Sequence, residues 1–398
     1  MNIGILGAGY SGVMLSLFLK LKDENIEITL FDHNDKVNKK LLATGNGRCN
    51  LGNLEINKDS YNCEMAYKLL NDFDIKKQIE LFNELGLMTR IINNTLVYPN
   101  SLSSNQVVAY LNKILNYYKI KVIDKVNLLD YKIENNEVIT TFSNHKSYKF
   151  DKFIFATGGK SKSTLGSDGS IFEILKKHKY KINTLKPGLT PIKVRENVRG
   201  IENERLKCHA KLYLDKVLAY EEDGEVLFKK DGLSGILIMN IESIIKRNKE
   251  AKKTCIVLDL FNDKTEEELF QIFKKYPRFR GFSFLEGIFT IKMSDFIRKN
   301  SNVKNLYNFT SSEINLIVKY VKNMEFTYLD SYDFNDSQVT IGGINFKDLN
   351  EDLSSKLEPN IYMIGEMLDI DGLCGGYNLM ASLASSYRVY KSLLDLNS

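Results

Sequence analysis

The sequence lacks tryptophan and is poor in the residues that usually build covalent or metal-bound frameworks. Its 398 residues include only five prolines, five cysteines and four histidines. The cysteines form no C-x-x-C pair and are spread along the chain at Cys49, Cys63, Cys208, Cys255 and Cys374. We therefore predict no metal site and no disulfide framework, and we expect free thiols in a reducing compartment.

Long apolar runs and blocks of like charge are missing as well. No stretch approaches the ~18–20 apolar residues of a membrane span. The expected first strand starts at residue 2, which leaves no room for a signal peptide. The formal net charge is +5, with basic and acidic residues interspersed. These features predict a cytoplasmic protein with neither a membrane nor a nucleic-acid partner.

What the sequence does contain begins at its N-terminus, where an apolar strand runs into a glycine turn and then an apolar helix. Gly7, Gly9 and Gly12 form a G-x-G-x-x-G motif, and a second strand ends at Asp32, twenty residues after Gly12. Gly7 allows the tight turn, Gly9 lets the backbone approach a pyrophosphate, and Gly12 lets the helix pack on the strand. Asp32 can accept hydrogen bonds from ribose hydroxyls. The motif therefore predicts a bound adenine dinucleotide.

Two further strand ends carry glycines, at residues 156–159 and 365–378. A nicotinamide dehydrogenase normally needs only the first glycine turn, whereas a flavoprotein of the glutathione-reductase-like kind uses all three. A helix starting near Gly376 would present free N–H groups to the negative edge of a reduced flavin. The three sites together favour FAD, and the single G-x-G-x-x-G motif implies that any NAD(P)H donor docks transiently.

The order of expected elements predicts a discontinuous α/β domain with the middle of the chain inserted into it. Helical patterns cover about residues 61–85, 104–118 and 170–178. Strands are expected at 121–126, over 132–142 with a turn at Asn135-Asn136, and at 152–155. The residue pattern changes near Pro187, and this change predicts that the chain passes there from one domain into another. Residues 192–250 are expected to be rich in strands, with a turn at 222–224, and residues 263–325 mostly helical.

Two long motifs resemble those of a known family. Residues 40–50 read K-L-L-A-T-G-N-G-R-C-N, and residues 365–378 read G-E-M-L-D-I-D-G-L-C-G-G-Y-N. Both are similar to signatures of bacterial FAD-dependent oxidoreductases often labelled aminoacetone-oxidase-like, which include the 3-dehydro-bile-acid reductases. The resemblance extends from residue 2 to about residue 390.

The resemblance implies an α/β fold with a glutathione-reductase-like, discontinuous FAD-binding Rossmann domain. It places that domain at residues 1–188 and 336–398, a β-barrel-like domain at 189–255 and 322–335, and a small helical insert at 256–321. The implied cofactor contacts are Gly7, Ala8, Gly9, Tyr10, Ser11, Gly12, Asp32, His33, Lys40, Leu41, Thr44, Gly45, Gly47, Arg48, Cys49, Asn50, Val126, Ala156, Thr157, Gly158, Gly159, Gly365, Glu366, Asp369, Gly375, Gly376, Tyr377 and Asn378.

This chain departs from the family pattern at several positions. Asp32 stands where the family usually has Glu, Lys230 replaces a histidine, and Met380 replaces a glutamine that could make a polar contact near the flavin. Cys49, Cys374, Asp369, Asp371 and His209 are better explained by packing, turns or the surface than by catalysis. Tyr377 could line a pocket or donate to a substrate carbonyl.

The resulting prediction is an FAD-dependent oxidoreductase that reduces an unsaturated ketone with electrons from NAD(P)H. The alternatives are an amine oxidase, a flavin-dependent RNA-modifying enzyme and a non-catalytic redox sensor. The substrate, the catalytic acid or base and the oligomeric state stay open.

Overall fold

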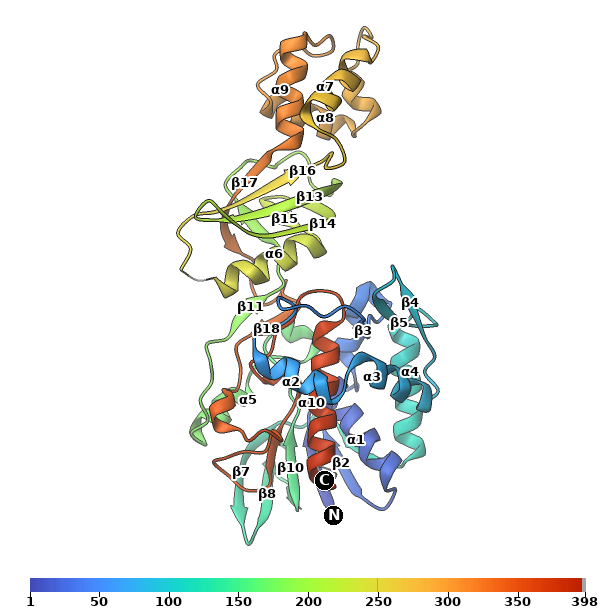
Figure 1. The fold of residues 1–398 in the computed structure, drawn as a ribbon. Coiled ribbons are helices and arrows are strands. Elements are labelled where there is room, and N and C mark those ends of the chain that lie inside the picture. The colour runs from blue at the N-terminus through green and yellow to red at the C-terminus, as the bar shows by residue number, and fades with distance from the viewer. Residues whose placement is uncertain (249, 396–398) are drawn as a thin grey trace. The chain divides into compact units, whose positions relative to one another are not determined.

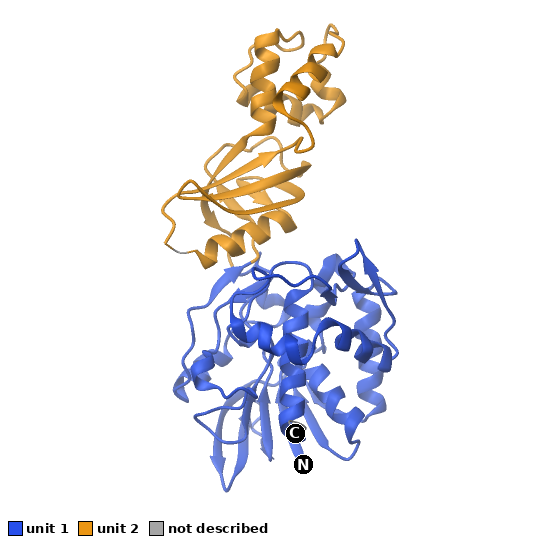
Figure 2. Cartoon of the chain, viewed as in Figure 1, with its two compact units in different colours: residues 1–188, 334–398 blue, residues 189–333 orange. Residues whose placement is uncertain are grey.

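The structure is a computed structural model that describes residues 1–248 and 250–395. The chain divides into two compact units (Figure 2). Unit 1 comprises residues 1–188 and 334–398, and unit 2 comprises residues 189–333. The first crossing between the units follows Gly188, next to the proline that marks a change of character in the sequence. The finer limits of a separate helical insert stay a prediction.

A five-stranded parallel sheet forms the centre of unit 1, as expected for a Rossmann-type domain (Figure 1). Its strands, in spatial order, are β19 (Ile361–Met363), β10 (Lys152–Phe155), β1 (Asn2–Leu6), β2 (Glu27–Phe31) and β6 (Lys121–Ile123). The central strands are apolar because both faces of the sheet are covered: side chains of β8 (Glu137–Phe142) and β9 (Ser147–Phe150), such as Phe142 and Phe150, pack on Phe31 of β2, while α1 (Tyr10–Lys22) also contacts β2. All five strands point the same way, so their carboxyl ends share one edge.

Among its described residues, unit 1 has the helices α1 (Tyr10–Lys22), α2 (Glu64–Asp72), α3 (Ile75–Glu84), α4 (Ser104–Tyr117), α5 (Ile171–Lys177) and α10 (Tyr377–Leu393). The helical pattern over 61–85 is two helices, because the Asp74 carboxylate accepts the backbone N–H of Lys77 and starts a new helix there. The first and last helices of the unit pack together, with the Phe18 and Tyr390 rings stacked at 5.4 Å.

Smaller strands and turns complete unit 1. They are β3 (Gly52–Asn53), β4 (Thr89–Ile92), β5 (Leu96–Pro99), β7 (Leu128–Glu134), β8 (Glu137–Phe142), β9 (Ser147–Phe150), β11 (Lys186–Gly188) and β18 (Val339–Ile341), with 3₁₀ turns η1 (Lys39–Gly47), η2 (Ser163–Leu165), η4 (Phe346–Asp348) and η5 (Gly365–Met367). The turn expected at Asn135 and Asn136 is confirmed, because β7 and β8 form a hairpin that turns there and both asparagines have positive φ.

Unit 2 contains a closed six-stranded antiparallel barrel. Around the barrel its strands are β12 (Ile192–Val194), β15 (Gly232–Ser234), β14 (Val217–Lys229), β13 (Arg205–Leu214), β16 (Thr254–Asp259) and β17 (Met324–Ser331). The predicted turn at 222–224 is wrong, because β14 runs straight through it and the hairpin turns at Asp215 and Lys216. Gly224 is instead a close-packing position, since a Cβ there would lie 2.9 Å from the Cβ of Leu237.

Helices fill the rest of unit 2. Within the stretch expected to be strand-rich lies α6 (Ile236–Arg247), whose buried faces include Leu237, Ile241 and Ile244. Its many isoleucines favour strands by propensity, but their 3–4 residue spacing suits a helix packed on the barrel. Between β16 and β17 come α7 (Glu266–Lys275), η3 (Phe284–Gly287), α8 (Ile291–Asn300) and α9 (Ser311–Lys322), in agreement with the helical expectation.

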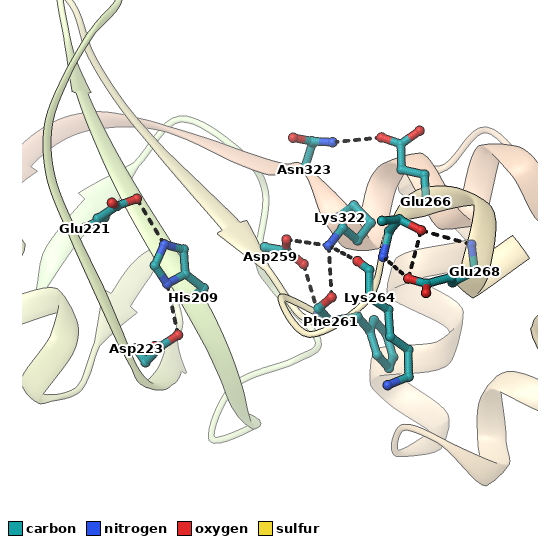
Figure 3. Close-up of polar contacts among 11 residues, drawn as sticks. His209, Glu221, Asp223, Asp259, Phe261, Lys264, Glu266, Glu268, Lys322 and Asn323 are labelled. Atoms are coloured by element: carbon teal, nitrogen blue, oxygen red, sulfur yellow. Dashed lines mark hydrogen bonds and ion pairs between the residues drawn. The ribbon is translucent and has the colours of Figure 1, made fainter.

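The Lys322 ammonium ties together the two chain segments that join the barrel to these helices (Figure 3). It lies 2.7 Å from Asp259 Oδ2 and donates to the carbonyl oxygens of Phe261 at 2.9 Å and Lys264 at 2.6 Å. On β13, His209 lies between Asp223 and Glu221 at 2.9 and 3.2 Å (Figure 3). Within residues 1–248 and 250–395 we find no group of three or more side chains suited to a metal ion.

In the same described ranges, every helix is too short or too polar to cross a bilayer.

Candidate functional site: the carboxyl edge of the central sheet

The glycine turn after β1 is tied to the loop after β10. Gly7 has φ +109° and donates its N–H to Phe31 O at 2.7 Å. A Cβ at Gly7 would lie 2.3 Å from Ala156 O, and one at Gly12 would lie 2.1 Å from Gly7 O. Side chains cannot be accommodated at these two positions without moving backbone, so both glycines are required by the fold itself.

Gly9 is different, because a Cβ there would meet no described atom within 4 Å. It has an ordinary φ of −81° and precedes Tyr10, the first residue of α1. The first turn of α1 contains no acidic residue, and no described side chain caps it. The open space and the positive end of the helix dipole suit a phosphate group.

Asp32 lies at the end of β2 and organises the turns on either side of it. Its Oδ2 accepts the Ala8 N–H at 2.8 Å, and its Oδ1 accepts the Asn34 N–H at 2.8 Å. The backbone N–H of Val126 donates to Asp32 O at 3.0 Å, and His33 follows in the same half-buried turn. A carboxylate has about four acceptor positions, so Asp32 can accept sugar hydroxyls as well.

The loop from Lys40 to Asn50 is held in an irregular conformation. Gly45, Gly47 and Cys49 all have positive φ, and a Cβ at Gly47 would meet no described atom within 4 Å. The Ser104 hydroxyl contacts the carbonyl oxygens of Leu42 at 2.8 Å and Gly47 at 2.9 Å. This hydroxyl fixes the loop against the start of α4.

Neighbouring contacts keep the rest of this loop in place. The Thr44 hydroxyl donates to Leu41 O at 2.7 Å, and the Arg48 guanidinium lies 5.4 Å from the centre of the Tyr98 ring. Burial raises the pKa of the Cys49 thiol to about 12, so Cys49 is not a thiolate near neutral pH. This supports packing rather than redox chemistry at Cys49.

Three buried polar side chains around the glycine turn have no hydrogen-bond partner among the described residues. They are the amide of Asn38, the Asn50 Oδ1 atom and the Tyr10 hydroxyl. The backbone N–H of Asn38 donates to Ala8 O at 2.8 Å, which places this asparagine directly beside the turn. Leaving such groups unsatisfied costs about 1–3 kcal/mol each. The cluster is therefore suited to a polar ligand.

Sequence reasoning did not identify Asn38 as a candidate. Its positive φ of 56° and its burial are properties of the folded loop. The only sequence signal was an asparagine just before the K-L-L motif.

An ion pair joins the Lys40 loop to the strand end after β19. Lys40 Nζ lies 2.5 Å from Glu366 Oε2, and the backbone N–H of Thr340 donates to Glu366 Oε1 at 3.0 Å. Gly365, with φ +78°, lies against α1, since a Cβ there would be 2.3 Å from Ser11 Oγ. The structure thus brings together segments that are more than 300 residues apart in the sequence.

The loop after β10 packs beneath the same edge. The Thr157 hydroxyl lies 3.9 Å from Met367 Sδ, and a Cβ at Gly159 would lie 2.3 Å from Thr340 Oγ1. Gly158 has φ +74° and lies against Ser167. The backbone of residues 156–159 is therefore fixed by neighbours on three sides.

The glycine pair before α10 allows close packing of backbone on backbone. Gly376 has φ +98°, and a Cβ there would lie 2.6 Å from the Cα of Gly52. Gly375 has φ +126° and lies beside Asn53. The Asn378 side chain accepts the Gly372 N–H at 2.8 Å and donates to Gly372 O at 2.9 Å. These contacts fix the start of α10 against β3, directly after the Lys40–Asn50 loop.

Tyr377 and Met380 have clear packing roles in α10. The Tyr377 hydroxyl donates to Glu55 O at 2.8 Å. This bond supports a role for Tyr377 in lining a pocket rather than in donating a hydrogen bond to a substrate. The Met380 sulfur accepts the Asn53 N–H at 3.0 Å in a fully buried position. A thioether thus occupies the position where the family's glutamine could make a polar contact.

Asp369 and Asp371 hold the preceding loop. Asp369 Oδ2 accepts the Asn183 side-chain amide at 2.5 Å, and the Asp371 N–H donates to Asn62 Oδ1 at 3.0 Å. These contacts agree with a loop-forming role for both residues. Cys374, half-buried on this loop, has its sulfur 3.7 Å from Gln338 Oε1.

Comparison with known proteins accounts for this arrangement. The model of the HI0933-like protein Rossmann domain matches residues 1–392. The chain belongs to this family. It is an enzyme of the flavoprotein oxidoreductase class, with a Rossmann-type domain that carries the glycine turns described above.

Its relatives have different named substrates. The chain is 28% identical to a 3-dehydro-bile acid delta(4,6)-reductase of Clostridium scindens, over 97% of each chain. It is 22% identical to a ribosomal RNA dihydrouridine synthase of Haemophilus influenzae, over 96% of each chain. Among solved structures, a quinol-fumarate reductase with menaquinol is 12% identical, with a TM-score of 0.48 over 98% of this chain and 70% of that chain.

Proposed function

We propose that this protein binds FAD at the carboxyl edge of the central sheet and reduces a carbon–carbon double bond conjugated to a carbonyl group. The observation that carries this proposal is the open space at Gly9, in front of the uncapped start of α1 and beside the unsatisfied side chains of Asn38 and Asn50. These features fit a large, polar, anionic ligand.

Each part of this edge suits one part of the cofactor. The N–H groups at the start of α1 would bind the pyrophosphate, and Asp32 would accept the ribose hydroxyls. The Lys40–Asn50 loop and residues 156–159 would bind the remainder of the cofactor. Bound flavin supplies hydride transfer to and from its ring. The start of α10 would place N–H dipoles near the negative edge of the reduced ring, which favours the reduced form.

The proposed substrate class follows from what the two relatives' names share. A 3-dehydro delta(4,6) steroid contains double bonds conjugated to a ketone, and uridine contains a double bond conjugated to its C4 carbonyl. Both named reactions add two hydrogens across an activated double bond, despite very different substrates. We infer the same reaction type here, with NAD(P)H as a transient electron donor and a cytoplasmic location in keeping with five free cysteines.

An anaerobic reduction experiment tests this proposal. NADH or NADPH should bleach the flavin absorbance of the purified protein, and a conjugated enone should restore it. The expected selectivity is fast reoxidation by enones and slow reoxidation by saturated ketones. Reduction by a primary amine instead would favour an amine oxidase, and no reduction by any donor would favour a redox sensor.

A second candidate substrate is a uracil base in RNA. One feature of this chain favours it specifically: residues 274–282 of unit 2 expose four cations and three aromatic rings. Free uridine and RNA belong in the same reoxidation panel, because faster reoxidation by RNA than by small enones would favour this candidate.

A further inference from the structure

Residues 274–282, the last two residues of α7 and the loop after it in unit 2, form an exposed segment of unusual composition. We call it the basic–aromatic segment. It reads K-K-Y-P-R-F-R-G-F, with four cations, three aromatic rings and no acidic residue. All nine residues are solvent-exposed, and the side chains of Tyr276, Phe279 and Phe282 are 39%, 41% and 42% exposed.

The segment is anchored at both ends, so its exposure is built into the fold. Phe273, just before it, is 2% exposed and packs on the Phe284 ring at 5.1 Å. Ser283, just after it, is buried and forms a reciprocal capping pair with Glu286 at the start of η3. Between these anchors, the Phe279 and Phe282 rings stack at 4.5 Å with their planes 19° apart.

The four cations are available to a partner. Among the described residues, Lys274, Lys275, Arg278 and Arg280 form no ion pair, and only Lys274 has a described ring contact, with Phe270. Other cations of the same helical region are neutralised locally, since Arg298 and Lys299 both pair with Asp295. Residues 261–323 contain eleven Lys and Arg against seven Asp and Glu, a formal charge of +4 in a chain whose total is +5.

We propose that the basic–aromatic segment is a docking surface for RNA, with the cations on phosphates and the exposed rings against unstacked bases. Single-stranded nucleic acids are bound by this combination of positive charge and aromatic stacking. A membrane surface fits less well, because guanidinium groups alternate with the rings and the segment has no aliphatic side chain to enter lipid. The prediction of no nucleic-acid partner rested on the net charge of the whole chain. That average conceals the local concentration of cations in this segment.

Binding of a fluorescein-labelled, single-stranded RNA oligonucleotide of mixed sequence to the flavin-loaded full chain tests the proposal. Fluorescence anisotropy measures the affinity over a salt series. We expect R278E/R280E to weaken binding at least about tenfold and to reduce the slope of log K against log salt by about 1 or more. F279L/F282L should weaken binding several-fold with little change of slope.

The matched control is K76E/K113E, which reverses two exposed cations of α3 and α4 in unit 1. It should leave RNA affinity within about twofold of the wild-type value. The loss of affinity depends on the number of phosphate contacts removed, and these two lysines lie outside the proposed docking surface. R278K/R280K should retain most of the affinity. Flavin absorbance and the thermal midpoint show that each variant is folded and loaded.

Equal loss in K76E/K113E and R278E/R280E would overturn the proposal, and so would unchanged RNA affinity in both segment variants. Tighter binding to vesicles of phosphatidylserine and phosphatidylcholine than to RNA would also overturn it, in favour of a membrane surface. RNA binding is measured without turnover, so failure of the reductase proposal would appear only in the reoxidation experiment.

Discussion

The two ends of the central sheet in unit 1 are built in opposite ways. At the carboxyl edge, Gly9 and Gly47 face open space, and the side chains of Asn38 and Asn50 contain buried atoms without partners. At the amino end of β19, Glu358 accepts hydrogen bonds from several side chains at once. One end of the sheet is thus satisfied by the protein's own groups, whereas the other end is left incomplete, as the proposed cofactor site requires.

The satisfied end is a network around Glu358. Its Oε2 accepts the hydroxyls of Tyr131 at 2.5 Å and Tyr180 at 3.0 Å, and its Oε1 lies 2.8 Å from His178 Nδ1. The other ring nitrogen of His178 lies 2.9 Å from Asp130 Oδ1, and the ring stacks on Tyr131 at 3.9 Å. Carboxylates on both ring nitrogens require the imidazolium, because a neutral histidine has only one N–H.

The largest effect on stability is expected from Glu358→Leu. This change leaves the buried Tyr131 hydroxyl and the Nδ1 atom of His178 without an acceptor, and it leaves the Tyr180 hydroxyl with Ser355 alone, which should cost about 3 kcal/mol. The thermal midpoint by circular dichroism measures the loss. The matched control is Glu134→Leu, which removes a carboxylate in an exposed pair with Lys132 and should cost less than about 1 kcal/mol. Equal effects of the two changes would contradict the comparison.

At the opposite edge, Gly9→Val should separate binding from stability. The Cβ of the new side chain would meet no described atom within 4 Å, and the φ of −81° suits a β-branched residue, so the midpoint of the flavin-free protein should stay within a few degrees. The same side chain would occupy the phosphate position and raise the Kd for FAD about a hundredfold, or ~2.7 kcal/mol. The ratio of flavin to protein absorbance measures this loss of FAD binding.

Gly12→Val is the counterpart of that change, because its Cβ would collide with the Gly7 carbonyl. It should lower stability with or without FAD. Full flavin occupancy in the Gly9→Val protein would show that the phosphate position is wrong.

The ion pair between Lys40 and Glu366 tests whether part of the carboxyl edge is also structural. Their side chains are 26% and 18% exposed, so Lys40→Met should cost about 1 kcal/mol of stability. A double-mutant cycle with Glu366→Gln isolates the pair. A coupling energy near zero would show that the pair contributes only to ligand binding.

The smallest expected effect is a pH dependence from the satisfied end. Burial disfavours the charged His178 ring, but hydrogen bonds to Asp130 and Glu358 outweigh it and raise its pKa above the ordinary 6.5. The stabilisation that the charged His178 ring gives the folded protein is therefore complete below the ordinary pKa of 6.5. It is lost as pH rises through the pKa of His178 in the folded state. The difference in unfolding free energy between the wild type and His178→Phe should fall over that range. A difference that stays constant or grows with pH would contradict the assignment.

Sequence patterns predicted those parts of the fold that depend on local signals. Gly7, Gly12 and the strands around them follow from a motif in which each glycine has one steric reason. The barrel strand through Gly224 and the helix α6 did not follow, because an Asp-Gly pair and a run of isoleucines signal turns and strands locally. In the fold, packing between β14 and α6 outweighed both signals.

The candidate site was predictable only as a set of segments. The motifs indicated which loops meet, and the contacts Ala8–Asp32, Lys40–Glu366 and Ser11–Gly365 agree with that expectation. They could not show which glycines face open space and which face backbone. Gly9 and Gly376 look alike in sequence, yet only the first leaves room for a ligand.

The interrupted course of unit 1 also has a consequence for synthesis on the ribosome. Residues 1–188 supply β10, β1, β2 and β6, but β19 and α10 emerge only after all of unit 2 has been translated. Until then β10 is an edge strand with unpaired backbone groups, open to wrong association. A nascent chain therefore cannot complete the central sheet and its carboxyl edge until translation is almost finished.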